Sequence, residues 1–206
     1  MLYYETIESS TLELLKSLQK ISIFNNLRLV GGTGLALQNG HRKSIDLDLF
    51  GNLEADELEI SDALNSFDQV KILQKSKNIF VYLINGIKTD IVRYKYEWLQ
   101  DPLIFDGISI AGKKDIAAMK LAAITGRGTK KDFIDLAFLL QEFSLKQMID
   151  FYSQKYPDGE EFLVIKSLGY FADADSEPSP VMLKNMSWDQ VKRIIQDNLN
   201  NYLSSQ

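Results

Sequence analysis

The order of apolar and polar residues divides the chain into a part with strand patterns and a part with helix patterns. Short runs rich in β-branched and aromatic residues, typical of strands, end near residue 111. From Lys113 onward, apolar residues recur every three or four positions, which predicts amphipathic helices. We therefore expect an α+β protein, with a mixed sheet and helices over residues 1–111 and a helical domain over residues 112–206 that packs across an active-site cleft.

The N-terminal part is predicted to open with a helix over residues 11–21, since Ser10-Thr11-Leu12-Glu13 has the spacing of a capping box. Asn85-Gly86 is typical of a hairpin turn between two strands. The predicted strands are 27–30, 45–49, 70–73, 79–84 and 87–94, with an extended segment over 103–110, and further helices are expected from Thr33 and over 56–67.

The C-terminal part contains three more patterns with capping-box spacing, at Thr129, Ser144 and Ser187, each before a helical run. The segment 173–180 is acidic and contains Ser and Pro, so we expect it to be extended. The predicted helices are 114–125, 130–143, 144–156, 160–171 and 187–203.

Composition narrows the class of protein. The chain has 206 residues, 45% of them apolar and 25% charged, as is usual for a soluble globular protein. The absence of Cys excludes disulfides and thiolate sites, and a single His argues against a histidine zinc site. The net charge of −5 argues against a general nucleic-acid coat but leaves a local basic patch open. No long apolar run is present, so we expect a cytoplasmic protein without membrane association.

Two glycines mark the centre of the predicted sheet. Gly31 and Gly32 directly follow the apolar run 27–30, where they let the backbone approach a ligand closely. Thr33 stands where a helix begins, and the backbone N–H groups of a helix start bind anions. We therefore expect Gly31, Gly32 and Thr33 to receive an anionic ligand.

Acidic residues alternate with apolar ones just downstream. Asp46 and Asp48 would share one face of a strand, where two carboxylates repel each other unless a cation lies between them. Asp90 stands in the middle of a further predicted strand. Together the three predict a site for two Mg²⁺ or Mn²⁺ ions that orients a triphosphate, with Asp90 accepting a hydroxyl proton. A solvated strand face is the usual explanation of a lone Asp-x-Asp, but the upstream glycine turn favours the metal site.

These motifs resemble one protein family. The residues that carry the resemblance are Gly31-Gly32-Thr33, Gly40–Leu49, Met119–Ala123, Arg127 and Lys131–Leu136. Over residues 27–140 the chain resembles the AbiEii/AbiGii toxins, within the DNA polymerase beta-like nucleotidyltransferase superfamily. One departure is the turn, which is Gly-Gly-Thr where the superfamily more often has Gly-Ser.

The resemblance implies a nucleotidyltransferase fold and a set of site residues. It implies that Asp46 and Asp48 hold metal, that Gly32 and Thr33 meet the triphosphate, and that Asp90 matches a third, variable carboxylate. It further implies that Lys120 contacts phosphate or nucleotide and that Asp135 belongs to the last motif.

The activity expected from this resemblance is metal-dependent transfer of NMP from an NTP to an RNA acceptor, with tRNA favoured. The protein would be the toxin of a toxin–antitoxin or phage-defence pair, held by a cognate antitoxin. Two alternatives stay open: transfer to a protein or to a small molecule such as an aminoglycoside, and a nucleotide-binding module without turnover.

Several basic residues near these motifs have two interpretations each. Arg42 either grips a phosphate or pairs with an acid, and His41 is better explained as a turn residue than as a base. Lys120 either lies along apolar surface or, as the resemblance favours, reaches a phosphate. Arg127, with Lys130 and Lys131, either contacts RNA phosphates or forms a solvated helix start.

The remaining candidates are two acids and two aromatic residues. Asp132 suits the first turn of a helix through the helix dipole, whereas Asp135 lies deeper and is better placed to orient Lys120 or Arg127. Tyr94 and Tyr96 are more often packing residues than platforms for a base.

Overall fold

The computed structural model describes residues 1–205; Gln206, the end of the predicted helical domain, lies outside the described residues. The chain forms two compact units. The N-terminal unit consists of Met1–Gln38, Ser44–Lys95 and Pro102–Ala111, and the C-terminal unit contains Asn39–Lys43, Tyr96–Asp101 and the chain from Gly112 onward. The two short segments of the C-terminal unit interrupt the N-terminal one in sequence, a feature that the patterns did not predict.

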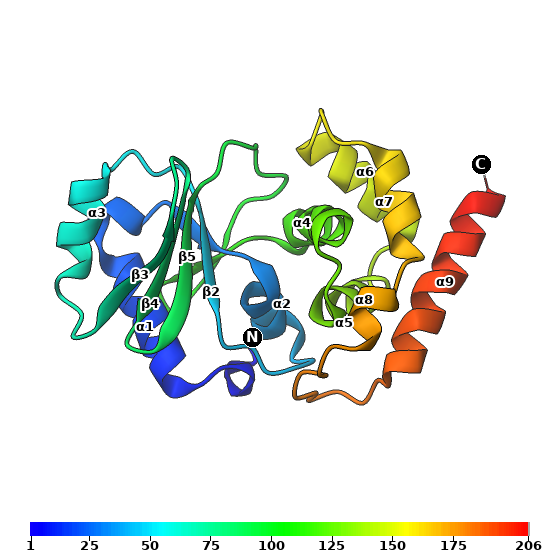
Figure 1. Cartoon of the computed structure of the whole chain (residues 1–206), viewed down its shortest axis with the longest axis horizontal. Coiled ribbons are helices and arrows are strands. Elements are labelled where there is room, and N and C mark those ends of the chain that lie inside the picture. Colours follow the sequence, from blue (N-terminus) through cyan, green and yellow to red (C-terminus); the bar gives the residue numbers. More distant parts are fainter. Residues whose placement is uncertain (206) are drawn as a thin grey trace. The chain divides into compact units, whose positions relative to one another are not determined.

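The N-terminal unit is built on one mixed sheet, so the α+β prediction is confirmed (Figure 1). Its strands are β1 (Leu27–Leu29), β2 (Leu47–Gly51), β3 (Val70–Lys75), β4 (Ile79–Ile84), β5 (Ile87–Arg93), β6 (Leu103–Phe105) and β7 (Ile108–Ile110). Their order is β3-β4-β5-β2-β1-β7-β6. β2 pairs with β5 in parallel, as β1 does with β7, and the other pairs are antiparallel.

Helices account for most of the remaining elements. The N-terminal unit contains 3-10 turns η1 (Tyr4–Thr6) and η2 (Ser22–Phe24) and helices α1 (Ser9–Lys20) and α3 (Glu57–Leu64), and α2 (Gly31–Asn39) begins in it. The C-terminal unit contains α4 (Lys113–Gly126), α5 (Lys130–Leu139), α6 (Leu145–Lys155), α7 (Glu161–Leu168), α8 (Ala172–Asp175) and α9 (Trp188–Ser204). Within that unit α4 packs against α5, α6 and α7, and α9 packs against the same three helices.

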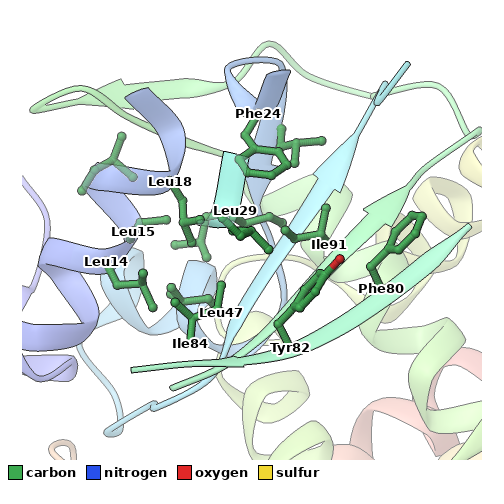
Figure 2. Close-up of a cluster of buried hydrophobic side chains, with 14 of the residues drawn as sticks. Leu14, Leu15, Leu18, Phe24, Leu29, Leu47, Phe80, Tyr82, Ile84 and Ile91 are labelled. Carbon is green, nitrogen blue, oxygen red and sulfur yellow. The ribbon is translucent and has the colours of Figure 1, made fainter. Parts of the chain in front are cut away.

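The core of the N-terminal unit lies on one face of the sheet. Figure 2 shows leucines of α1 facing apolar side chains of β2, β4 and β5. Leu47 and Leu49 of β2 are fully buried there, as is Ile91 of β5. Because side chains alternate along a strand, the residues between them point to the opposite face. That alternation turns the acidic residues of β2 and β5 away from the core.

The observed helix starts agree with some of the predicted capping boxes and contradict others. Ser144 and Ser187 form the predicted boxes, each accepting from the backbone N–H three residues on. The Ser10 box is wrong, because α1 already begins at Ser9 and its N-cap, Glu8, makes no side-chain cap. The extended prediction for residues 173–180 is wrong at its start, which forms α8. Among the described residues, none of the helices has the length and apolar character needed to cross a bilayer.

Candidate active site

Strand pairing brings two of the predicted carboxylates together. Asp48 of β2 and Asp90 of β5 are register partners on neighbouring parallel strands. Partners on adjacent strands project to the same face of a sheet, so both carboxylates lie opposite the leucine core. Both residues are half-buried, so their carboxylates belong to the surface of the unit and not to its interior.

The glycine turn closes on one of these carboxylates. A Cβ on Gly31 would lie 2.1 Å from Oδ2 of Asp48, so only a residue without a side chain leaves room for this carboxyl group. Gly31 also has φ of +64°, in the left-handed region that favours glycine. The N-terminus of α2 and the Asp48 carboxylate are therefore adjacent because residue 31 is glycine.

Asp46 lies one residue before β2, so its predicted position within the strand is wrong by one residue. Its backbone carbonyl accepts from the hydroxyl of Thr33, which also bonds Ser44 Oγ at 2.8 Å. Thr33 is fully buried by these contacts. Its hydroxyl therefore braces the segment before β2, and the predicted contact of Thr33 with a triphosphate has no support from its position.

The donor set of this site suits a hard cation. Among the described residues no group of three or more His, Cys, Asp and Glu side chains is gathered to hold a metal. Mg²⁺, however, is commonly held by one or two carboxylates together with substrate phosphates. The Asp48–Asp90 pair, next to a glycine that leaves space and a helix N-terminus that suits phosphate, fits that arrangement. Asp48 and Asp90 would hold the ion, with Asp46 as the third predicted ligand.

A lysine that the sequence analysis did not single out contacts Asp90. Nζ of Lys88 lies 2.6 Å from Oδ1 of Asp90. The two residues are two apart on β5 and therefore share one face of the sheet. The signal was available in the pattern Ile87-Lys88-Thr89-Asp90, where the lysine alternates in step with the acid.

A second polar cluster lies in the C-terminal unit and is centred on Asp135. Arg42 donates to both carboxylate oxygens, from Nε at 2.7 Å and from Nη2 at 2.9 Å. His41 Nε2 lies 2.8 Å from Oδ1, and Lys120 Nζ lies 2.6 Å from Oδ2. Asp135 is fully buried, so it organises three basic side chains from inside the unit.

Asp132 continues this cluster to the surface. It accepts from Lys120 Nζ and from Arg127 Nε, each at 2.9 Å, and from the Thr129 hydroxyl at 2.7 Å. Asp132 was predicted only as a favourable first-turn residue, yet it joins Lys120 to Arg127. The Arg127 side chain is 67% exposed, so the positive charge of the cluster reaches solvent there.

Burial and the neighbouring charges together determine which side chains of the cluster are ionised. Burial favours the neutral forms of Asp132 and Asp135, but the Lys120 ammonium and the neighbouring arginines outweigh it and lower the pKa of both carboxyl groups. Burial likewise favours neutral Lys120, but the two carboxylates raise its pKa. Burial lowers the pKa of His41, and its hydrogen bond to Asp135 opposes this only in part. The imidazole is thus neutral while its neighbours are charged.

These contacts change how several predicted residues are interpreted. Arg42 pairs with an acid, as one of its two interpretations had it, but inside the unit and not at the surface. His41, predicted as a turn residue, is a buried partner of Asp135. Lys120 is buried and bonded to two carboxylates, so its predicted phosphate contact is less accessible than that of Arg127.

Of the other basic and aromatic candidates, Lys130, Tyr94 and Tyr96 lie in packing positions. Lys130 is buried and donates to the backbone carbonyls of Asp175 and Glu177, whereas Lys131 is exposed. Tyr94 packs against Phe50 with ring centroids 5.4 Å apart. Tyr96 packs edge-on against Tyr156, at 4.7 Å.

Comparisons with known proteins agree with this fold. The family described as "Nucleotidyl transferase AbiEii toxin, Type IV TA system" matches residues 13–204. An uncharacterized protein of Aquifex aeolicus (strain VF5) is 36% identical over 199 residues, covering 94% of this chain and 96% of the relative.

Solved structures with similar folds share little sequence with this chain. A putative nucleotidyltransferase from Helicobacter pylori is 16% identical, with a TM-score of 0.60 and coverage of 97% of this chain and 99% of that one. MenT4, a nucleotidyltransferase toxin of Mycobacterium tuberculosis H37Rv, is 14% identical, with a TM-score of 0.54 and coverage of 90% and 79%. At these identities the likeness supports a nucleotidyltransferase fold.

Proposed function

Since the chain belongs to the AbiEii family of nucleotidyl transferase toxins, we propose that it transfers NMP from an NTP to an RNA acceptor, with tRNA as the favoured substrate. The observation that carries this proposal is the pairing of Asp48 with Asp90 on adjacent strands, next to the glycine at the start of α2. We further propose that the protein is the toxin of a toxin–antitoxin or phage-defence pair, restrained by a cognate antitoxin.

In the proposed reaction a hydroxyl oxygen of the acceptor attacks the α-phosphorus of the NTP. The bond from that phosphorus to the β-phosphate oxygen breaks, and pyrophosphate leaves. Asp90 accepts the hydroxyl proton, and the backbone N–H groups at the start of α2 bind the triphosphate. Asp46, Asp48 and Asp90 would hold Mg²⁺ or Mn²⁺, which neutralises charge on the phosphates.

The residues of the C-terminal cluster have different proposed roles. Arg127, the exposed member, contacts phosphate of the nucleotide or of the acceptor. Lys120 and Asp135 support that contact from inside the unit, because both are buried and bonded to each other. Removal of Asp135 would leave Arg42 and Lys120 buried without their shared acceptor.

A labelling experiment tests the proposal. The purified protein is incubated with Mg²⁺, each labelled NTP in turn, and total RNA, and the label is followed into RNA and protein fractions. We expect label in RNA with the wild type and a loss of at least about 100-fold with Asp48→Asn, the scale for removing one electrostatic group of a catalytic site. Asp62→Asn, which changes an exposed carboxylate on α3, is the matched control and should retain activity.

Three results would contradict the proposal. Label in the protein fraction alone would assign a different acceptor, and undiminished transfer by Asp48→Asn would remove the proposed site. Stabilisation by NTP and Mg²⁺ without any transfer would indicate a nucleotide-binding module.

A further inference from the structure

Lys88 occupies the position of a counter-ion within the proposed metal site. Its ammonium lies 2.6 Å from Oδ1 of Asp90, and the side chains of Lys88 and Asp90 are 43% and 22% exposed. The register pairs Asp90 with Asp48 across the parallel ladder, so the ammonium lies on the sheet face that carries both carboxylates. A positive charge is therefore present on the sheet face that carries both carboxylates, in contact with one of them.

We propose that Lys88 is a resident cation that keeps Asp90 in position and competes with divalent metal for its carboxylate. This inference rests on the proposed function, because it assumes that Asp90 is a metal ligand. Without metal, the ammonium reduces the repulsion between Asp48 and Asp90 and so keeps both carboxylates on their shared face. Metal that binds Asp90 either takes Oδ1 from the ammonium or binds Oδ2 close to it, and in both cases the positive charge of Lys88 opposes metal binding.

The geometry gives Lys88 room to move away. Its side chain has a flexible four-carbon stem and is partly exposed, so the ammonium can leave Asp90 for solvent without a change in the backbone. The resulting competition weakens metal binding until substrate phosphates add their own ligands. Lys88 is thus a positioning residue that acts through Asp90.

The simpler alternative is an ordinary surface ion pair. Exposed pairs of this kind contribute little to stability and have no further role. Such a pair would affect thermal stability slightly and leave metal affinity unchanged, which separates it from the resident cation.

The deciding measurement is the dissociation constant of Mn²⁺ itself, obtained from the EPR signal of free Mn²⁺ and from calorimetry on the full chain. We expect Lys88→Met to lower this constant about twofold to fivefold, the factor that corresponds to removing a partly screened charge pair. Lys88→Arg keeps the charge and should restore most of the wild-type value.

Lys71→Met is the matched control. Lys71 lies on the same sheet face, since its partner Leu83 is also the partner of Lys88, but β4 separates it from β5. The same change of charge at this more distant position should leave Mn²⁺ affinity within error of the wild type. A general effect of net charge would instead appear equally in both variants and would overturn the inference.

A double-mutant cycle completes the test. In an Asp90→Asn background, Lys88→Met should no longer change the Mn²⁺ dissociation constant, because the carboxylate for which the cations compete is gone. Unchanged affinity of Lys88→Met in the wild-type background, with or without a lower Tm, would overturn the inference and leave the proposed function intact. Failure of the wild type itself to bind Mn²⁺ would instead overturn the metal-dependent function, and the inference with it.

Discussion

Gly31 fixes the place of the Asp48 carboxylate. We expect Gly31→Ala to abolish nucleotidyl transfer, because the new Cβ would lie 2.1 Å from Oδ2 of Asp48 and must push the carboxyl group aside. Mn²⁺ affinity should fall in the same variant, which calorimetry can measure. The strain of a positive φ should also lower stability by about 1 kcal/mol.

A second glycine separates the two effects. Gly86 has φ of +82°, and a Cβ at this residue would meet nothing within 4 Å, so Gly86→Ala introduces strain without a clash. We expect it to lose similar stability and keep both transfer and Mn²⁺ binding. Equal loss of activity in the two variants would mean that stability, and not the position of Asp48, limits the enzyme.

His41 makes a prediction about pH, which is easy to assign because it is the only histidine of the chain. Its Nε2 donates to Asp135, and within the described residues its buried Nδ1 has no hydrogen-bond partner, so a second proton would have no acceptor. Burial accordingly lowers the pKa of His41 below its ordinary 6.5 in the folded protein.

The direction in which stability changes with pH follows from proton linkage. Near pH 6.5 the unfolded chain binds a proton at His41 that the folded protein does not, so stability is present above this pH and falls as the pH drops below it. Denaturant unfolding should show stability falling as the pH drops below 6.5, with a slope of at most about 1.4 kcal/mol per pH unit for this one proton. His41→Gln should lose this slope, and a variant that kept it would contradict the assignment.

At the scale of helices and strands, the local sequence pattern was sufficient to predict an element wherever the contacts that form it lie close together in the sequence. The β-branched and aromatic run Ile79–Ile84 and the Asn85-Gly86 turn predicted a hairpin that forms as expected, with positive φ at both turn residues. Ser144 and Ser187 cap their helices because both partners of each box lie within four residues.

The sequence pattern did not predict structure that depends on contacts between residues far apart in the chain. The start of the segment 173–180 forms a helix turn whose Ala174 is buried, and the carbonyls of Asp175 and Glu177 accept from Lys130, more than 40 residues away. Thr129 has cap-like spacing, but its hydroxyl donates to the Asp132 carboxylate that also binds Lys120. A local rule cannot foresee such tertiary partners.

The candidate active site could likewise be predicted only in part. The carboxylates and the glycine turn could be predicted as residues, because their spacing is local. Their contact could not be derived from pattern, because Asp48 meets Asp90 only when β5 lies beside β2, an order that the sequence does not display. Lys88 was overlooked for a related reason, since a lysine beside an acid is ordinary on a solvated strand.

At the scale of the whole molecule, the C-terminal unit is made of three separate segments of the chain. Two of these segments, Asn39–Lys43 and Tyr96–Asp101, are short. Each is attached there by a buried carboxylate. Asp135 accepts from Arg42 in the first segment, and Asp115 of α4 accepts from the backbone N–H groups of Leu99 and Gln100 in the second.

The second attachment depends on a buried lysine. Lys155 of α6 donates to Oδ1 of Asp115 at 2.7 Å and to the carbonyl of Glu97 at 2.9 Å, and neither side chain of the ion pair is exposed. We expect Lys155→Met to destabilise the protein by about 3–5 kcal/mol, because it leaves the Asp115 carboxylate buried without its counter-ion. Chemical denaturation measures this loss.

Hydrogen exchange locates the effect of the same variant. The amides of Leu99 and Gln100 should exchange faster, because their acceptor Asp115 loses the charge that holds it, whereas amides of β4 should change only with global stability. Lys146→Met, on the same helix, removes an exposed ion pair with Asp150 and should cost no more than about 0.5 kcal/mol. Similar losses in the two variants would show that helix α6, and not the buried pair, is what both changes disturb. A large loss confined to Lys155→Met, with faster exchange at residues 99 and 100, would identify Asp115 and Lys155 as the attachment of the segment Tyr96–Asp101.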